Sequence, residues 1–216
     1  MNKISLKSEW FSLALIAATI ILGIIWYPHL PAQVPAHWNI AGQVDNYMTP
    51  LGHVLTFTGL MIGMYLLFLL IPFIEPRKEN LAKSGPFLQF IKSFLLFFFF
   101  VLFVAISWTS IHSGALAIDK IVSAMMGFLF IGIGNYLGQV KSNFFMGIRT
   151  PWTLSSDDIW QKTHRLGSYT FVIGGLLFLL GLFMPTPWNF TIPFVGILLA
   201  SLIPVVYSYI LFVNKK

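Results

Sequence analysis

The stretch Trp10–Tyr27, WFSLALIAATIILGIIWY, contains 18 residues and no charged side chain. As a helix it would reach roughly 27 Å, close to the roughly 30 Å thickness of the hydrocarbon core of a bilayer. A secretory signal peptide is the rival interpretation, because Lys3 and Lys7 precede the run. The apolar core of a signal peptide is usually only ~7–15 residues long. The stretch therefore predicts an uncleaved transmembrane helix.

The composition of the whole chain favours lipid as its solvent. Of the 216 residues, 57% are hydrophobic and only 9% are charged, whereas soluble domains carry roughly 25% charged residues. Five further apolar runs are long enough to span a bilayer. They are Leu51–Ile74, Ser93–Ile111, Ile121–Val140, Leu166–Met184 and Ile192–Phe212. The sequence thus predicts an all-α, polytopic integral membrane protein with six transmembrane helices. It has no cysteine, which excludes disulfides and thiol chemistry.

Basic residues collect in alternate gaps between the apolar runs. Twelve of the 13 are Lys3, Lys7, Arg77, Lys78, Lys83, Lys92, Lys141, Arg149, Lys162, Arg165, Lys215 and Lys216. The other gaps contain a single basic residue, Lys120. Because positively charged flanks stay in the cytoplasm, both termini are expected to be cytoplasmic. The loops 28–50, 112–120 and 185–191 are expected outside.

This distribution also bears on partners and on organisation. A net charge of +6 would suggest nucleic acid for a soluble protein. Here the charge orients the chain, so the expected partner is the lipid bilayer, with no direct binding of nucleic acid. We expect an N-terminal membrane region, 1–112, with the Pro-rich outer loop 28–50. A second region, 113–216, would contain the cytoplasmic loop 141–165.

The outer loop, YPHLPAQVPAHWNIAGQVDNY, is rich in proline and has one acidic residue. Its prolines favour an extended, polyproline-like path. The sequence HWNIAG then predicts a turn, because Asn39 can bond its own backbone and Gly42 can take a positive φ. Such a loop is a shaped surface on which binding is expected. Its candidate binding residues are Pro35, His37, Trp38, Asn39, Gly42 and Asp45.

Histidines also gather on this expected outer side. They are His29, His37, His53 and His112, with Asp45 beside them. Two or three of these side chains could in principle hold Zn²⁺, but their spacing is not a recognised ligand pattern. Interfacial histidines more commonly bond lipid headgroups or turn carbonyls, so we expect no metal and no cofactor.

The densest polar run, NFFMGIRTPWTLSSDDIWQKTH, covers Asn143–His164. Thr150 must be extended because Pro151 follows it. Ser155 is expected to be the N-cap of a helix that begins near Ser156, with Asp158 at capping-box spacing. One stripe of this helix would hold Ile159, Trp160, Thr163 and His164. The helix would either break at Gly167 or continue into the next span.

Two interpretations of this run remain open. It is either a solvated connector, in which Arg149 meets Asp157, Asp158 or a lipid phosphate, or a folded cap over the cytoplasmic mouth of the bundle. In the cap, Arg149 and His164 would present donors to a partner. An arginine at the bilayer centre costs about 2.5–3.5 kcal/mol on insertion scales, so either form lies at the interface or lines a wet cavity. The residues alone favour the connector.

The same run closely resembles the signature of the SdpI family, membrane immunity proteins against a secreted sporulation-delaying toxin. The shared positions are Asn143, Gly147, Arg149, Thr150, Pro151, Trp152, Thr153, Leu154, Trp160, Thr163 and His164. The upstream LPAQVPAHWNIAGQVDNY is similar to the uncharacterised domain that often precedes this signature. The resemblance implies a protein, not an enzyme, that protects the membrane from a toxic peptide. In some members it is coupled to a cytoplasmic repressor.

The candidate binding residues of the cytoplasmic motif follow from this signature. They are Asn143, Gly147, Arg149, Thr150, Pro151, Trp152, Thr153, Trp160 and His164. The resemblance supplies no catalytic residues. The sequence therefore predicts a multi-pass membrane protein that gives immunity to, or senses, a secreted membrane-active toxin peptide, with a loop able to bind a regulatory partner.

Two other functions stay open. A transporter or channel is compatible with six spans and with Pro204, which predicts a kinked last helix whose freed carbonyl Ser201 or Ser208 could satisfy. Transport of ions usually needs acids or bases inside the membrane, and the nearest polar candidate is Asn135. A metal-dependent membrane hydrolase could use the outer histidines, but nucleophile, base and acid are not persuasively assembled.

Overall fold

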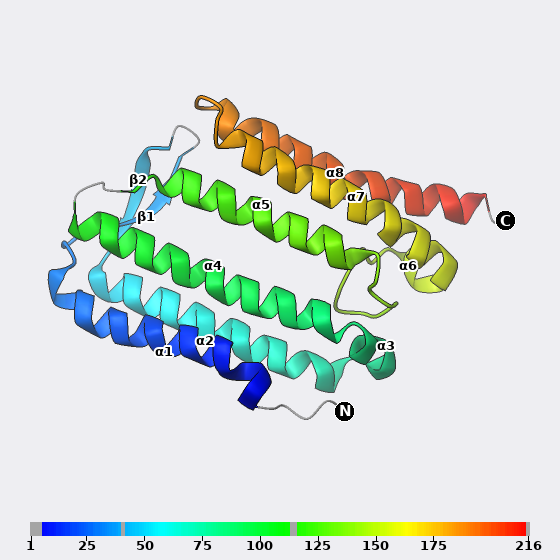
Figure 1. Ribbon diagram of the computed structural model, residues 1–216, viewed down its shortest axis with the longest axis horizontal. Coiled ribbons are helices and arrows are strands. Elements are labelled where there is room, and N and C mark those ends of the chain that lie inside the picture. Colours follow the sequence, from blue (N-terminus) through cyan, green and yellow to red (C-terminus); the bar gives the residue numbers. More distant parts are fainter. Residues whose placement is uncertain (1–5, 40–41, 113–115, 215–216) are drawn as a thin grey trace. The chain divides into compact units, whose positions relative to one another are not determined.

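The computed structural model describes residues 6–39, 42–112 and 116–214. Its elements run in the order α1 (Leu6–Trp26), η1 (Tyr27–His29), β1 (Val34–Trp38), β2 (Val44–Met48), α2 (Pro50–Ile74), α3 (Lys78–Lys83), α4 (Gly85–Ile111), α5 (Ile118–Leu137), α6 (Pro151–Ser155), α7 (Asp157–Gly181) and α8 (Trp188–Val213) (Figure 1). Lys3, Lys215 and Lys216, which entered the orientation argument, lie outside the described residues.

The predicted helical membrane architecture is confirmed in its main character. Among the described residues, five helices are long and apolar enough to cross a membrane: Glu9–His29, Pro50–Ile74, Gly85–Ile111, Ile118–Leu137 and Trp188–Val213. The sixth predicted span, Leu166–Met184, lies mostly within α7, whose first turns carry charged residues. That span stays a prediction. The helix α7 begins at Asp157 and runs through Gly167 without a break.

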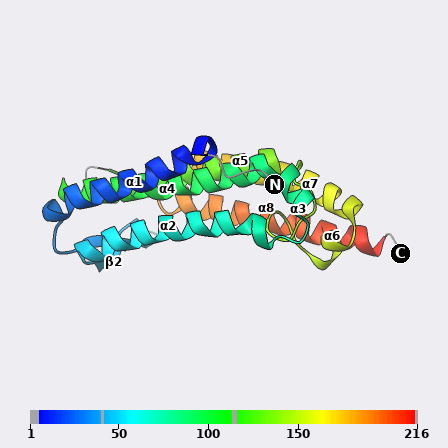
Figure 2. The same ribbon diagram turned by 90° about the horizontal axis from the view of Figure 1, so that it is seen from below.

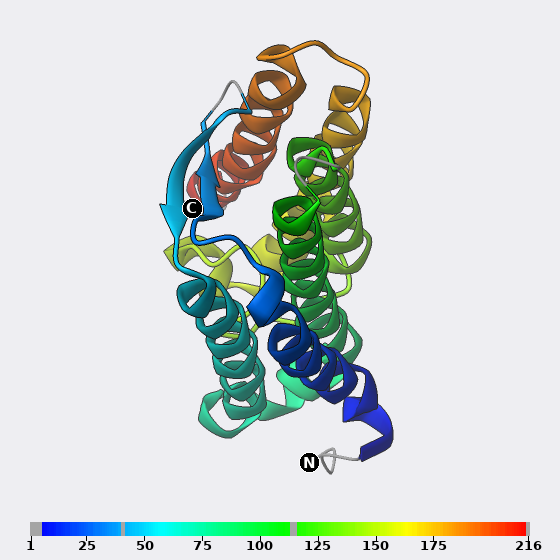
Figure 3. The ribbon, with the colours of Figure 1, turned by 90° about the vertical axis from the view of Figure 1, so that its left-hand side faces the viewer.

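The outer loop departs from an all-α chain because it forms a β-hairpin. Strands β1 and β2 pair antiparallel, with Val34 opposite Met48 and Pro35 opposite Tyr47 (Figure 3). The extended path predicted from the prolines is therefore paired, which a two-stranded sheet permits because Pro35 needs no ladder partner for its nitrogen.

The turn of this hairpin follows the residues predicted for it. The N–H of Gly42 donates to the carbonyl of Asn39 at 2.8 Å, and Gly42 has a φ of 74°. The N–H of Gln43 donates to Oδ1 of Asn39 at 3.0 Å. The roles of Asn39 and Gly42 in the turn are confirmed, and residues 40–41 between them lie outside the described part of the chain.

The chain forms two compact units. The hairpin unit comprises Asn2–Phe68 and Lys92–Val122, and the motif unit comprises Leu69–Ile91 and Ser123–Lys216. The division falls within α2, α4 and α5, and each unit is described by itself below.

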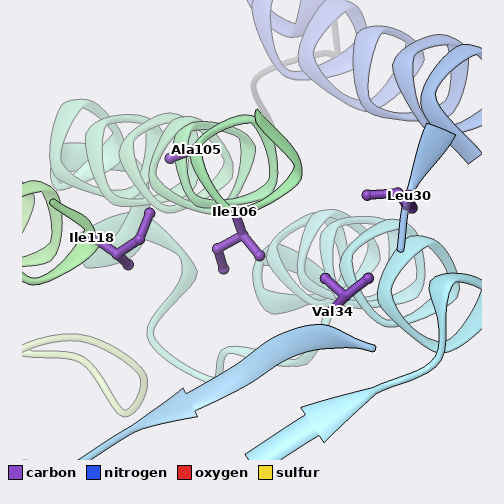
Figure 4. Close-up of a cluster of buried hydrophobic side chains, with 5 residues drawn as sticks. All are labelled: Leu30, Val34, Ala105, Ile106 and Ile118. Atoms are coloured by element: carbon purple, nitrogen blue, oxygen red, sulfur yellow. The ribbon is translucent and has the colours of Figure 1, made fainter. Parts of the chain in front are cut away.

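The hairpin unit packs β1 onto helices through a buried apolar cluster. Its members are Leu30, Val34, Ala105, Ile106 and Ile118 (Figure 4). Trp38 and Met48, one from each strand, add their partly buried side chains to it. Burying these groups is the main force that holds a hairpin of this size, since two strands alone are marginally stable in water.

The motif unit pairs α7 with α8 and leads into α7 through the short helix α6 (Figure 2). At Gly134 of α5, a Cβ would lie 2.7 Å from the carbonyl oxygen of Ser168 in α7, so this close approach requires glycine. In α8, Pro204 frees the carbonyl of Ala200, which accepts a hydrogen bond of 2.7 Å from Thr170 of α7. The predicted partners Ser201 and Ser208 instead bond Ile197 and Val205.

A buried ion pair joins α1 to α4 in the hairpin unit. Nζ of Lys92 lies 2.7 Å from both carboxylate oxygens of Glu9, and both residues are 5% exposed. The ring of Tyr65 lies 5.8 Å from the same Nζ. Helix α4 begins at Gly85, eight residues before the predicted span, so Lys92 lies within it. Opposite charges that neutralise each other allow this extension into an apolar environment.

We expect Glu9→Gln or Lys92→Met to lower the free energy of unfolding by about 3–5 kcal/mol, because each leaves a buried charge without its counter-ion. The double variant Glu9→Leu/Lys92→Met should recover most of this loss. Unfolding in detergent micelles measures both. Asp158→Asn is the matched control, since it removes an exposed pair worth roughly 0–1 kcal/mol. Equal losses at the two pairs would contradict the assignment.

Candidate functional site

The motif segment, residues 141–165, begins with a turn built around Asn143. This side chain is fully buried. Its Oδ1 accepts hydrogen bonds from the N–H groups of Phe145 at 2.9 Å and Met146 at 2.7 Å. Its Nδ2 donates to the carbonyl of Lys141 at 2.8 Å. The backbone that follows α5 is not helical, and the side-chain amide of Asn143 supplies the hydrogen bonds that a helix would have provided.

Residues just after α2 clasp the motif segment. The carboxylate of Glu75 is fully buried and accepts from the N–H groups of Phe144 at 3.0 Å and Arg77 at 2.7 Å. The guanidinium of Arg77 donates to Oγ of Ser142 and, at 3.2 Å, to the carbonyl of Leu154. Its centre also lies 4.9 Å from the ring centroid of Phe144.

Helix α3 and its C-cap residue, Ser84, add two further contacts to this clasp. Nδ2 of Asn80 donates to the carbonyl of Ser142 at 2.8 Å, and Oγ of Ser84 accepts from the N–H of Lys141 at 3.0 Å. Glu75, Arg77, Asn80 and Ser84 were not among the residues predicted for the site. An acid immediately after an apolar run is the one local signal that pointed there, because such a charge needs a partner.

The side chain of His164 joins two parts of the motif segment through hydrogen bonds. Its Nε2 accepts from the N–H of Ile148 at 2.9 Å, and its Nδ1 lies 2.8 Å from the carbonyl of Trp160. These partners fix a neutral ring that carries its proton on Nδ1. The ring also stacks on Trp160 with centroids 4.0 Å apart. Gly147 has a φ of 101°, and a Cβ there would lie 2.3 Å from Nε2 of His164.

Burial lowers the pKa of His164 to about 4, although its hydrogen bond to the Trp160 carbonyl acts in the opposite direction. His164 precedes Leu166, where the predicted span begins. Its side chain is fully buried. The cap interpretation placed a donor of His164 at the surface. In the structure this donor, Nδ1–H, instead bonds the carbonyl of Trp160 inside the segment.

The stripe predicted for α7 is confirmed. Ile159, Trp160, Thr163 and His164 are all buried. Nε1 of Trp160 donates to the carbonyl of Val140 at 2.7 Å, which ties the helix to the end of α5. The motif segment is thus folded against its own helix.

The start of α7 corrects the predicted capping. Ser156, not Ser155, is the N-cap, and its side chain accepts from the N–H of Ile159. Oγ of Ser155 donates to the carbonyl of Trp152 at 2.9 Å. The reason is the unpredicted helix α6, in which Thr150 and Thr153 form a reciprocal capping box and Pro151 occupies the first turn.

Thr150 has the extended backbone predicted for it, with φ −109° and ψ 162°. Its Oγ1 lies 3.1 Å from Oγ of Ser208, which connects the motif segment to α8. Trp152 is partly buried, and its ring centroid lies 5.0 Å from that of Tyr209.

Arg149 and Pro151 are the exposed members of the predicted motif. Arg149 donates to the carbonyl of Phe144. The suggested partner Asp158 instead pairs with Lys162 at 3.0 Å. The exposed guanidinium is therefore held in place by a backbone carbonyl of its own segment, in a position that a partner can reach.

The predicted outer residues are distributed over the hairpin. Nδ1 of His37 lies 2.6 Å from Oδ1 of Asp45, and both side chains are exposed. His53 is fully buried, and its Nε2 lies 2.9 Å from Oγ of Ser107. Within the described residues there is no group of three or more His, Cys, Asp or Glu side chains that could hold a metal ion.

Comparison with known proteins finds similarity in this part of the chain. Residues 139–208 match the SdpI/YfhL protein family. Residues 14–62 match a domain of unknown function (DUF1648). The immunity protein SdpI of Bacillus subtilis (strain 168) is 25% identical over 205 residues, which cover 94% of this chain and 95% of that protein. No solved structure matches.

The matched region contains the motif segment and its contact with α8, whereas the clasp residues Glu75, Arg77, Asn80 and Ser84 lie outside it. It extends from the end of α5 through the motif segment to Ser208, the residue of α8 that contacts Thr150. The resemblance predicted from the motif is thereby confirmed, and the protein is a multi-pass protein of the cell membrane.

Gly147→Ala is expected to lower the free energy of unfolding by at least about 2–3 kcal/mol, since it combines a strained φ with a clash against His164. Gly42→Ala is the matched control, because its φ of 74° is also positive but no atom lies within 4 Å of the added Cβ. Its loss should be limited to about 1–2 kcal/mol of backbone strain. Denaturant unfolding compares them, and equal effects would show that the His164 contact is unimportant.

The stability of the motif unit should fall on mild acidification. The pKa of His164 drops from its usual 6.5 to about 4 on folding, so the unfolded chain binds the proton first as pH decreases. The contribution of the neutral ring is fully present above pH 6.5 and is lost as pH falls from 6.5 toward 4.

Unfolding midpoints across this pH range measure the effect. The slope should flatten in His164→Asn and persist in His29→Asn, which removes an exposed histidine. An unchanged slope in His164→Asn would assign the pH dependence to another group.

Proposed function

We propose that this protein protects its membrane against a secreted membrane-active peptide, or senses that peptide, without catalysing a reaction. The observation that carries the proposal is the match to an immunity protein over nearly the full length of both chains. The folded motif segment adds to it, because its side chains are engaged in building a cap and not a catalytic centre.

The proposed topology has six transmembrane helices and both termini in the cytoplasm. The sixth span is the apolar part of α7, Leu166–Met184. Its support is the placement of the basic residues other than Lys92 and Lys120 in alternate gaps between the spans. In this topology the hairpin is outside and the motif segment is cytoplasmic. A reporter fused after Lys216 should then be active in the cytoplasm, and activity on the outer side would invert the assignment.

The two exposed surfaces have separate proposed roles. On the outer side, the hairpin presents His37, Asp45 and Tyr47 to an arriving peptide, all of them exposed. On the inner side, Arg149 is exposed and anchored, so the cap offers a fixed cation to a cytoplasmic regulatory partner such as a repressor. The predicted regions 1–112 and 113–216 would divide these roles between them.

Transport is the second candidate, because one structural observation favours it. The Glu9–Lys92 pair is buried within the helices of the hairpin unit. Ionisable residues inside membrane helices commonly mark ion or proton pathways. Flux through liposomes that contain the purified protein separates the two candidates, since an immunity protein needs no flux.

Expression of the protein should raise the survival of a sensitive cell challenged with membrane-lysing peptides. Asp45→Ala should weaken this protection, because it removes the hairpin carboxylate. Arg149→Ala should leave insertion and protection intact while it weakens any cytoplasmic coupling. Membrane abundance of each variant is the control. Unchanged survival against a panel of such peptides would count against immunity.

A further inference from the structure

A polar hollow lies beside the clasp of the motif unit. Its volume is about 290 Å³, and its lining residues are Arg77, Asn80, Leu154, Ser155, Ser156 and Asp157. This volume is near the lower end of small-molecule sites, which span roughly 300–1,000 Å³. The hollow is formed by the loop after α2, the helix α3 and the junction of α6 with α7, all within the motif unit.

The hollow contains one group of each charge. Arg77 uses one hydrogen of each terminal nitrogen in its bonds to Ser142 and Leu154, and further N–H donors of its guanidinium remain. Asp157 is exposed at the start of α7. The two groups line the same hollow without forming an ion pair with each other. A ligand that carries both an anionic and a cationic group would complement them.

The position of the hollow along the chain indicates how deep in the membrane such a ligand binds. Helix α2, a candidate span, ends at Ile74. Phe73 and Ile74 are 56% and 57% exposed, as expected for side chains that face lipid. Arg77 follows within one helical turn of this apolar end. An arginine there lies at the level of the phospholipid headgroups, and its planar fork matches the geometry of a phosphate.

We propose that this hollow binds a phosphoethanolamine group, with its phosphate at Arg77 and its ammonium at Asp157. The second amide hydrogen of Asn80, whose first hydrogen bonds the carbonyl of Ser142, supplies an additional hydrogen bond to a phosphate oxygen. Phosphatidylethanolamine is the source that the depth favours. Phosphatidylcholine offers no N–H donor to Asp157, and phosphatidylglycerol offers no cation. The site does not depend on the proposed immunity function.

The test uses the full-length protein purified in detergent with defined lipid mixtures, and native mass spectrometry counts the lipids retained. Wild-type protein should retain phosphatidylethanolamine about three- to tenfold more than phosphatidylcholine, the ratio given by one additional charge-assisted contact. Asp157→Asn should reduce this preference to near one, with phosphatidylglycerol retention not reduced.

Asp158→Asn is the matched control. It removes the neighbouring exposed carboxylate, which pairs with Lys162 and does not line the hollow. Its lipid preference should equal that of the wild type. Arg77→Lys keeps the charge but loses the fork, so it should lower retention of phosphatidylethanolamine and phosphatidylglycerol alike. Equal preferences in Asp157→Asn and Asp158→Asn, or no wild-type preference over phosphatidylcholine, would overturn the proposal.

A soluble headgroup distinguishes the source of the ligand. Glycerophosphoethanolamine that displaces the retained lipid would assign the site to the headgroup alone, available from either lipid or solution. Retention that resists this competitor would assign it to the membrane lipid. Both results support phosphoethanolamine recognition, whereas displacement by glycerophosphocholine at the same concentration would contradict it.

Discussion

The non-helical backbone between α5 and α6 must satisfy its own hydrogen bonds, because it adjoins helices that cross a membrane. Unsatisfied N–H groups near lipid cost several kcal/mol each. Side-chain acceptors at intervals along the segment bond these N–H groups. Glu75 accepts from Phe144, Asn143 from Met146, and His164 from Ile148. Thr153 then accepts from Thr150, where α6 begins. The geometry of the motif segment depends on these acceptors.

The same constraint explains which parts were predictable from sequence. Local signals gave the helices, the buried stripe of α7, the extended Thr150 and the turn at Asn39, because periodicity and backbone preferences act over a few residues. The hairpin was missed because short strands that contain proline lack the alternation that marks a strand. The short helix α6 was missed because Ser155 offered an equally good cap one turn later.

The clasp could not be predicted because its partners are distant in sequence. Glu75 and Phe144 are separated by 69 positions, and Arg77 and Leu154 by 77. A single sequence contains no periodicity that links such pairs. One boundary was also misplaced: the predicted span began at Ser93, so Lys92 was counted in the gap before it. Glu9, 83 positions away, supplies the counter-ion that makes its place in α4 possible.

The motif segment contains buried residues that build it and exposed residues that a partner can reach. Asn143, Trp160 and His164 are buried and their hydrogen bonds hold the segment together, so the fold of the segment depends on them. Arg149 and Pro151 are exposed. Asn80 and Asp157 line the hollow but stand outside the signature. A substitution of Asp157 would change the ligand without disturbing the motif segment, whereas Asn80 also bonds the carbonyl of Ser142. The exposed surface of the motif segment can therefore change while its buried hydrogen bonds stay the same, and this surface is the part that a ligand or partner meets.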